Sequence, residues 1–90
     1  MRTSSRSGQF KKDVKLAEKR GKNLSKLKLI LDLLIEEEPL PAQCKDHSLR
    51  GDFMGSRDCH IEPDWILIYQ IGSNHVTFER TGTHSDLFRR

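Results

Sequence analysis

Residues 65–71 read WILIYQI and form the strongest strand pattern in the chain, from which the rest of the architecture can be worked out. Apolar side chains fill both alternating sets of positions, with Trp65, Leu67 and Tyr69 in one set and Ile66 and Ile68 in the other. Successive side chains of a strand point to opposite faces of its sheet. A strand that is apolar on both faces is buried on both. We therefore expect a central strand, with helices covering one side of the sheet.

Turn residues separate this strand from two others. Residues 56–62 (SRDCHIE) precede it across a turn at 63–64, and residues 75–81 (HVTFERT) follow it across a turn at 72–74. Connections as short as these join antiparallel neighbours. Residues 2–6 are short, polar and extended in character, and we expect them to form an edge strand.

Two helices are predicted before the central strands. Ser7 can cap the first and Gly21 can end it, whereas Asn23 can cap the second, which Pro39 and Pro41 stop. Apolar residues repeat at helical spacing in both, at Phe10, Val14 and Ala17 in the first and at Leu24, Leu27, Ile30, Leu31 and Leu34 in the second. The sequence thus predicts an α+β fold, in which two N-terminal helices pack on a small antiparallel β-sheet.

Length and composition limit the class of protein. Ninety residues, 34% hydrophobic and 32% charged, suffice for a single domain over residues 1–90 and leave no room for a second core. The most apolar stretch, Leu24–Ile35, contains Ser, Lys and Asp and is too short to span a bilayer. No apolar run follows the N-terminal arginines, so we see no signal peptide and expect a cytoplasmic protein. In that reducing compartment, Cys44 and Cys59 should be free thiols.

Positive charge is concentrated at the N-terminal end. The formal net charge is +3, but residues 1–28 hold ten Lys and Arg against two Asp and Glu. Residues 29–46 hold one Lys or Arg against five Asp and Glu, and residues 47–90 hold five Lys and Arg against six Asp and Glu. A basic segment attracts polyanions such as RNA. A solvated helix face has the same composition, so the charge alone leaves both interpretations open.

Side chains suited to proton transfer gather in the C-terminal half. They are His47, His60 and His84, accompanied by Asp64, Arg57 and Arg80. RNA cleavage by its own 2′-hydroxyl needs a base for the hydroxyl proton, an acid for the leaving 5′-oxygen, and positive charge at the phosphate. Histidine suits the first two roles because its unperturbed pKa is about 6.5. Arginine suits the third, because its planar fork matches phosphate oxygens. This chemistry requires no metal.

Each histidine also has a purely structural interpretation. His47 can hydrogen-bond the carbonyls of its loop, and His60, beside Cys59 in a strand, can be a satisfied core histidine. His75 follows a turn, and we expect it to face solvent. His84 has no packing reason for its position, so the structural and the functional interpretations are equally open there.

Zinc binding is a competing interpretation of Cys44, His47, Cys59 and His60. Structural zinc sites favour two spaced pairs, each on a knuckle or a helix turn. The adjacent Cys59 and His60 would point to opposite faces of a strand. We therefore rank a zinc-binding regulator last, and expect no metal and no other cofactor.

Two aromatic residues, Trp65 and Phe88, can stack on RNA bases. Sheet packing is the structural alternative for Trp65 and the one that composition favours. For Phe88 the alternative is a hydrophobic contact near the C-terminus.

Three motifs, in order, closely resemble the YafQ branch of the RelE-like toxins. They are KDHSLRG at 45–51, RDCHIEPDWILIY at 57–69 and FERTGTHSDLF at 78–88. The stretch SGQFKKDVKLA at 7–17 resembles the first helix of that family. The resemblance covers nearly the whole chain, and the combination of motifs is specific.

The resemblance implies a microbial-ribonuclease-like sheet with two N-terminal helices. It also implies an mRNA interferase of a type II toxin–antitoxin system, which cleaves mRNA in the ribosomal A site and so inhibits translation. The implied mechanism is metal-independent attack by the 2′-hydroxyl, giving a 2′,3′-cyclic phosphate and a 5′-hydroxyl. Other RelE-like toxins use Lys, Arg and Tyr, so the histidine-rich set here points to the YafQ branch.

Site residues follow from the resemblance where the motifs match. The matching positions are His47, His60, Asp64, Trp65, His84 and Phe88. His84 would be the principal catalyst, as general acid. Either His60 or Asp64 would be the base, and His47 would share proton transfer or hold phosphate. Trp65 and Phe88 would shape a base pocket. On chemical grounds, Arg80 and Arg57 are further substrate-binding candidates.

The resemblance also implies partners. They are the 70S ribosome with its mRNA, and a cognate antitoxin of the DinJ/RelB type whose C-terminal segment wraps the toxin. Operator DNA would be contacted only through the antitoxin complex, and no membrane is involved. The basic first helix is a candidate surface for ribosomal RNA, and grooves of the sheet and helices for the antitoxin. The alternative hypothesis is a ribosome- or RNA-binding translation inhibitor that does not cut, a role that Lys and Arg would serve as well as His.

Overall fold

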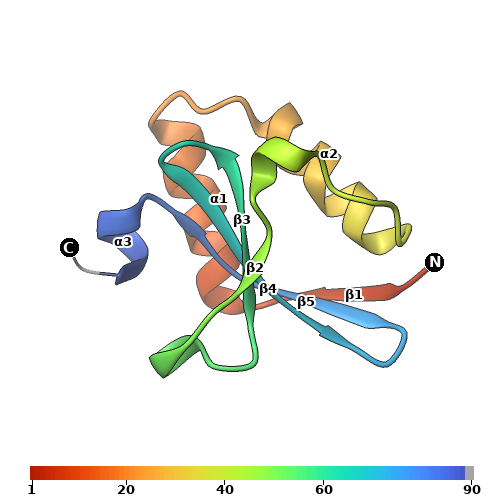
Figure 1. Ribbon diagram of the computed structural model, residues 1–90. Coiled ribbons are helices and arrows are strands. Elements are labelled where there is room, and N and C mark those ends of the chain that lie inside the picture. Colours follow the sequence, from red (N-terminus) through yellow and green to blue (C-terminus); the bar gives the residue numbers. More distant parts are fainter. Residues whose placement is uncertain (89–90) are drawn as a thin grey trace.

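The computed structural model describes residues 1–88, which form a five-stranded sheet and three α-helices (Figure 1). Along the chain the elements are β1 (Thr3–Arg6), α1 (Gly8–Lys19), α2 (Leu24–Ile35), the 3-10 turn η1 (Ala42–Cys44), β2 (His47–Ser48), the 3-10 turn η2 (Gly51–Phe53), β3 (Arg57–Glu62), β4 (Trp65–Gly72), β5 (His75–Gly82) and α3 (His84–Phe88). The strand order is β1-β5-β4-β3-β2. The expected α+β architecture is confirmed.

β4 is the central strand, as its double apolar pattern predicts. Trp65, Leu67 and Tyr69 are at most 2% exposed and join the main core with α1 and α2. Ile66 and Ile68 point to the opposite face and pack in a second cluster with α3 and η2. The two long helices and the short C-terminal helix therefore cover different faces of the sheet.

Both long helices begin where the sequence predicts, and α1 ends just before Gly21, whereas α2 ends at Ile35, before the two prolines that were expected to stop it. The Ser7 side chain accepts the backbone N–H of Phe10 at 2.9 Å, and the Asn23 side chain accepts that of Ser25 at 3.0 Å. Such caps contribute about 1 kcal/mol each. Gly21 follows α1 with a φ of 78°, in the left-handed region that glycine adopts without strain.

The sheet is mixed, not wholly antiparallel. β1 lies at the edge as expected, but it runs parallel to β5, with Thr3 opposite His75 and Arg6 opposite Phe78. All four β1 side chains are exposed, so no apolar pattern in the sequence marks the direction of this strand. His75 is partly exposed at this edge, and its ring lies 2.6 Å from Thr3 Oγ1 and 3.0 Å from Ser5 Oγ, which are contacts that the sequence does not predict.

Two short elements form in segments where the sequence predicts no regular structure. β2 has two residues and α3 has five, and neither length shows a readable periodicity. Both carry expected site residues, since β2 begins at His47 and α3 begins at His84. These elements therefore fix backbone positions that a loop would leave free.

The sequence predicts that no segment spans a membrane and that the two cysteines are free thiols. Over residues 1–88, no helix is both long and apolar enough to cross a membrane. Cys44 and Cys59 are buried free thiols, as expected.

Candidate active site

Three histidines from three elements meet on the face of the sheet that carries α3. His60 in β3 pairs with Ile66, so both side chains belong to that face. The His60 ring centroid lies 6.5 Å from that of His47 and 5.6 Å from that of His84, in both cases edge-on. His60 therefore stands between the other two, and the three rings form an imidazole row. The His47 and His84 side chains are 57% and 48% exposed, so the row is open to a large substrate.

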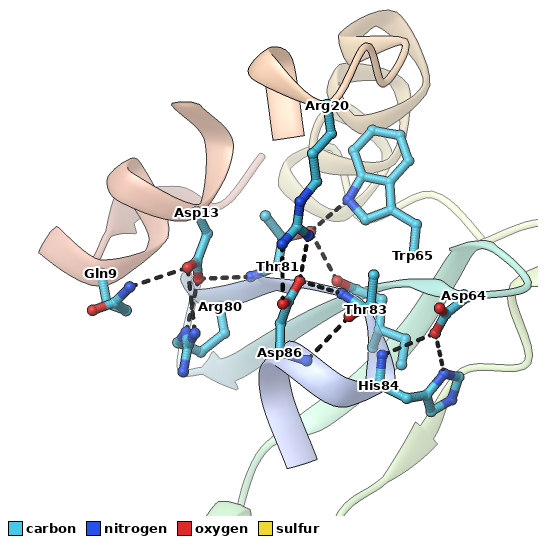
Figure 2. Close-up of polar contacts among 11 residues, drawn as sticks. Gln9, Asp13, Arg20, Asp64, Trp65, Arg80, Thr81, Thr83, His84 and Asp86 are labelled. Carbon is cyan, nitrogen blue, oxygen red and sulfur yellow. Dashed lines mark hydrogen bonds and ion pairs between the residues drawn. The ribbon is translucent and has the colours of Figure 1, made fainter. Parts of the chain in front are cut away.

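Asp64, in the turn between β3 and β4, holds His84 (Figure 2). Asp64 Oδ1 accepts the backbone N–H of His84 at 2.9 Å and lies 2.6 Å from His84 Nδ1. These hydrogen bonds, first the backbone one and then the side-chain one, lower the pKa of Asp64, so its carboxyl group stays ionised. An ionised carboxylate only accepts hydrogen bonds. Nδ1 of His84 therefore carries a proton, and Nε2 is left for another partner.

His47 is held through the same ring atom. Its Nδ1 donates to the Lys45 carbonyl oxygen at 2.8 Å and lies 2.9 Å from Asp58 Oδ1. Both neighbours are acceptors, so the proton of His47 also sits on Nδ1. Among the side chains that the structure describes, none forms a hydrogen bond with Nε2 of His47 or of His84. Both rings are therefore held through Nδ1, and within the described part of the chain their Nε2 atoms face no hydrogen-bond partner.

A buried carboxylate that the sequence analysis did not single out belongs to the same group. The Asp58 side chain in β3 is only 5% exposed. Burial raises the pKa of Asp58, and the charges of His47, His60 and His84 partly offset this rise. Its Oδ1 atom accepts no hydrogen bond from the described residues, because the His47 N–H is directed to the Lys45 carbonyl. The period of two along β3 already puts Asp58 and His60 on one face, and this was the signal available in the sequence.

An aromatic pair borders the imidazole row. The Phe88 ring centroid lies 6.2 Å from that of His84 and 5.9 Å from that of Phe53. Both phenylalanines are partly buried against the second core cluster. Phe53 lies in η2 and was not singled out from the sequence. Rings placed in this way can stack on an RNA base.

A surface hollow of about 300 Å³ opens beside His60. Its lining also includes Gln43, Lys45, Ile61, Glu62 and Pro63. Its volume lies at the lower end of the range for small-molecule sites. A larger hollow, of about 480 Å³, lies beside Arg57 and Tyr69 and includes none of the three histidines. The smaller hollow is therefore the one that adjoins the imidazole row.

The two arginines expected at the phosphate are engaged elsewhere. Arg57 donates to both carboxylate oxygens of Asp46, at 2.8 to 3.3 Å, and these hydrogen bonds raise the pKa of Arg57. Arg80 Nε donates to Asp13 Oδ2 at 2.7 Å, and Figure 2 shows this guanidinium beside α1 and away from the His84 ring. The structure does not bring either arginine to the imidazole row.

Trp65 lies on the other face of the sheet. It is 1% exposed, and its Nε1 donates to Thr81 Oγ1 at 2.9 Å. Lys22 Nζ lies 5.8 Å from the centre of its ring. The structure therefore unites His47, His60, His84, Asp64 and Phe88, and places Trp65 in the main core.

Comparisons with known proteins all find similarity to YafQ toxins, and the similarity extends over almost the full chain. A family model described as "Bacterial toxin of type II toxin-antitoxin system, YafQ" matches residues 2–89. The mRNA interferase toxin YafQ of Escherichia coli (strain K12) is 58% identical over 83 residues, covering 91% of this chain and 90% of that protein. The crystal structure of YafQ from E. coli strain BL21(DE3) has a TM-score of 0.93 at 54% identity, covering 98% of this chain and 99% of that one. A chain of the E. coli DinJ-YafQ toxin-antitoxin complex has a TM-score of 0.90 at 56% identity, covering 97% of each.

Proposed function

Because the chain belongs to the YafQ family of toxins of type II toxin–antitoxin systems, we propose that it is a ribosome-dependent endoribonuclease that cleaves mRNA in the ribosomal A site. The observation that carries the proposal is the imidazole row, in which His47 and His84 are each oriented through Nδ1. A module that only bound RNA would need positive charge. It would have no use for histidines oriented through Nδ1 by fixed acceptors.

His84 is the general acid of the proposed reaction. Its Nδ1–H points at Asp64, so a protonated His84 delivers its second proton from Nε2 to the leaving 5′-oxygen. The ionised Asp64 fixes the ring and stabilises the imidazolium. This contact resembles the support that a carboxylate gives to the histidine of a catalytic triad.

The general base is His60 or His47. The neutral base takes the 2′-hydroxyl proton, the 2′-oxygen bonds to phosphorus, and the 5′-oxygen leaves with the proton from His84. Asp64 was the other candidate base from the sequence. It suits that role poorly, because its pKa is lowered and its Oδ1 already accepts from His84. The products are a 2′,3′-cyclic phosphate and a 5′-hydroxyl, and no metal is needed to balance the step.

Substrate contacts follow from the surroundings of the row. Phe88 is placed to stack on a base beside His84, and the hollow beside His60 is open to a neighbouring nucleotide. Arg57 and Arg80 would have to leave their carboxylates to reach a phosphate, so their role in binding stays a prediction. The same holds for Trp65, whose burial favours packing.

Basic residues of α1 form the proposed ribosome contact. Lys11, Lys12, Lys15 and Lys19 are exposed, and none of them forms an ion pair with the side chains that the structure describes. Ribosomal RNA is the polyanion that such a surface would meet in the cytoplasm, where we place the protein. A DinJ-like antitoxin is the proposed inhibitory partner, in keeping with the relative solved in complex with DinJ. Operator DNA would be reached only through that complex.

The decisive test is a reconstituted translation reaction in which new 5′ ends on the mRNA are mapped by primer extension. We expect ends at the A-site codon with ribosomes present, and none on naked mRNA. Translation that stops without new ends would support the non-cleaving inhibitor, and equal cutting of naked mRNA would contradict ribosome dependence. In a binding arm, Lys11→Glu combined with Lys15→Glu should weaken ribosome affinity at physiological salt. Unchanged affinity would remove α1 from the interface.

The substitution Asp58→Asn should raise the stability of the folded protein while lowering its cleavage activity. The pKa of Asp58 is raised by burial, so its ionised form is disfavoured in the folded protein. That penalty is present above the folded pKa and disappears as the pH falls below the ordinary range of an aspartate. The neutral variant should therefore resist denaturant better than the wild type at pH 7, and the difference should shrink in acid.

Cleavage by the same variant should fall by about tenfold, the lower end of the loss observed when the supporting partner of a metal-bound histidine is removed. The acid limb of its pH profile should move to lower pH, because a nearby carboxylate favours a protonated imidazole. Rates measured across pH on programmed ribosomes would show both effects. An unmoved acid limb would mean that Asp58 has a structural role only.

A further inference from the structure

α3 carries His84 and Phe88 but has only five residues. A helix of one turn is not stable by its own hydrogen bonds, so its position must come from the surroundings. We propose that Arg20 and Asp86 form a clamp between α1 and α3 that positions His84 for proton transfer. This inference rests on the proposed function, and it assigns to Arg20 and Asp86 a positioning role that the family motifs do not assign.

The first half of the clamp is a reciprocal cap at the start of α3. Asp86 Oδ2 accepts the backbone N–H of Thr83 at 3.0 Å, and Thr83 Oγ1 accepts the backbone N–H of Asp86 at 3.1 Å. This pattern is that of a capping box, with Asp in place of the usual Glu or Gln. Because His84 lies between these two residues, the cap fixes the backbone from which its imidazole projects.

The second half ties this cap to α1. Arg20, which follows the last turn of α1, reaches across to Asp86 (Figure 2). Its two terminal nitrogens lie 2.6 Å from Oδ2 and 3.2 Å from Oδ1. Paired, charge-assisted hydrogen bonds of this kind are stronger and more directional than neutral ones. The Arg20 hydrogen bond, followed by the backbone N–H of Thr83, lowers the pKa of Asp86, so the carboxylate remains charged at neutral pH.

Gly82 provides an independent sign that Asp86 must fold back closely. A Cβ atom added at Gly82 would lie 2.9 Å from both Cβ and Oδ2 of Asp86. The φ of Gly82 is not in the left-handed region, so its backbone conformation does not require glycine. A side chain at this position is disfavoured only by the steric clash with Asp86. Any larger residue at 82 would displace the Asp86 carboxylate from both Thr83 and Arg20.

The clamp and Asp64 restrain His84 from two sides. Asp64 comes from the β3–β4 turn and fixes the ring through Nδ1, whereas the clamp comes from α1 and fixes the helix. If the clamp is lost, the Asp64 contact alone restrains the His84 ring and helix α3, and α3 can then shift. A misplacement of about 1 Å at a catalytic group lowers rates by roughly a hundredfold.

Three variants remove the clamp by different means: Arg20→Gln, Asp86→Asn and Gly82→Ala. Each should lower kcat for cleavage on programmed ribosomes by about tenfold to a hundredfold. KM for ribosomes should stay within about twofold for Asp86→Asn and Gly82→Ala, since neither removes a cation. Arg20→Lys should recover part of kcat, because one charge-assisted contact remains.

Lys28→Gln is the matched control. It breaks an ion pair of 2.8 Å with Asp32 on α2, which belongs to no part of the proposed site. Its kcat should equal that of the wild type. A kcat for the three clamp variants within about twofold of the wild type would overturn the proposal, as would an equal loss in the control.

Nuclear magnetic resonance tests the clamp without relying on cleavage. Amide exchange in α3 should accelerate, and the His84 ring signals should shift, in all three variants but not in Lys28→Gln. Unchanged exchange and ring signals would refute the clamp. If these changes appear while the wild type cuts no mRNA, the proposed function fails and the clamp stands as a structural feature.

Discussion

Replacing His84 with alanine is expected to lower the rate of mRNA cleavage by about 10²–10⁴-fold, the usual contribution of a general acid or base. The fold should persist, because this side chain is 48% exposed and, among the residues that the structure describes, its polar contacts are with Asp64 in a surface turn. Without the imidazole, the group that we propose as the proton donor to the leaving 5′-oxygen is lost. Single-turnover cleavage on programmed ribosomes measures the effect, and circular dichroism checks the fold.

His75→Ala is the matched control for this experiment. His75 has the same side chain, but it contacts Thr3 and Ser5 at the β1 edge and is not part of the imidazole row. This variant should cleave at close to the wild-type rate. Asp64→Asn should fall between the two, because His84 remains but loses the charge that supports its imidazolium. A fully active His84→Ala protein would remove His84 from catalysis.

The parts of the fold that the sequence predicts well are those with local and periodic signals. β4 is identified by its two apolar faces, and the caps at Ser7 and Asn23 act within three residues of themselves. The direction of β1 has no such signal, because its contacts with β5 involve residues about 70 positions away and its side chains are all exposed. α3 is too short for periodicity and depends on Arg20, 66 residues from Asp86.

In the site, too, some features could be predicted from the sequence and others depend on contacts between residues far apart in the chain. His47, His60, His84 and Asp64 could be selected from residue chemistry and motif likeness, and the structure brings them together. What the sequence did not reveal is which charged residues are already paired. Arg80 forms an ion pair with Asp13, 67 residues away in the sequence. From its chemistry alone, this guanidinium was expected to bind the phosphate. Such pairings depend on the packing of α1 against β5, which exists only in the folded chain.

Trp65 gives the second large effect, and here we expect stability to change before chemistry. Trp65→Ala should lower the free energy of unfolding by about 3–5 kcal/mol, as for other large-to-small changes at buried aromatic residues. The indole is 1% exposed, and its loss also leaves Thr81 Oγ1 without its donor. A domain of this size has a total stability of roughly 5–15 kcal/mol, so much of it would be lost. Denaturant unfolding at equilibrium measures the change.

Trp65→Phe distinguishes packing from substrate contact. Phenylalanine keeps most of the buried apolar area and loses only the hydrogen bond to Thr81, so the cost should be about 1 kcal/mol. If Trp65 serves the core, this folded variant should cleave mRNA at nearly the wild-type rate, because the indole faces away from the imidazole row. A stable Trp65→Phe protein with at least tenfold weaker cleavage would instead place Trp65 at the RNA, as the family motif implies. The buried position of the ring and its engaged N–H make the first outcome the expected one.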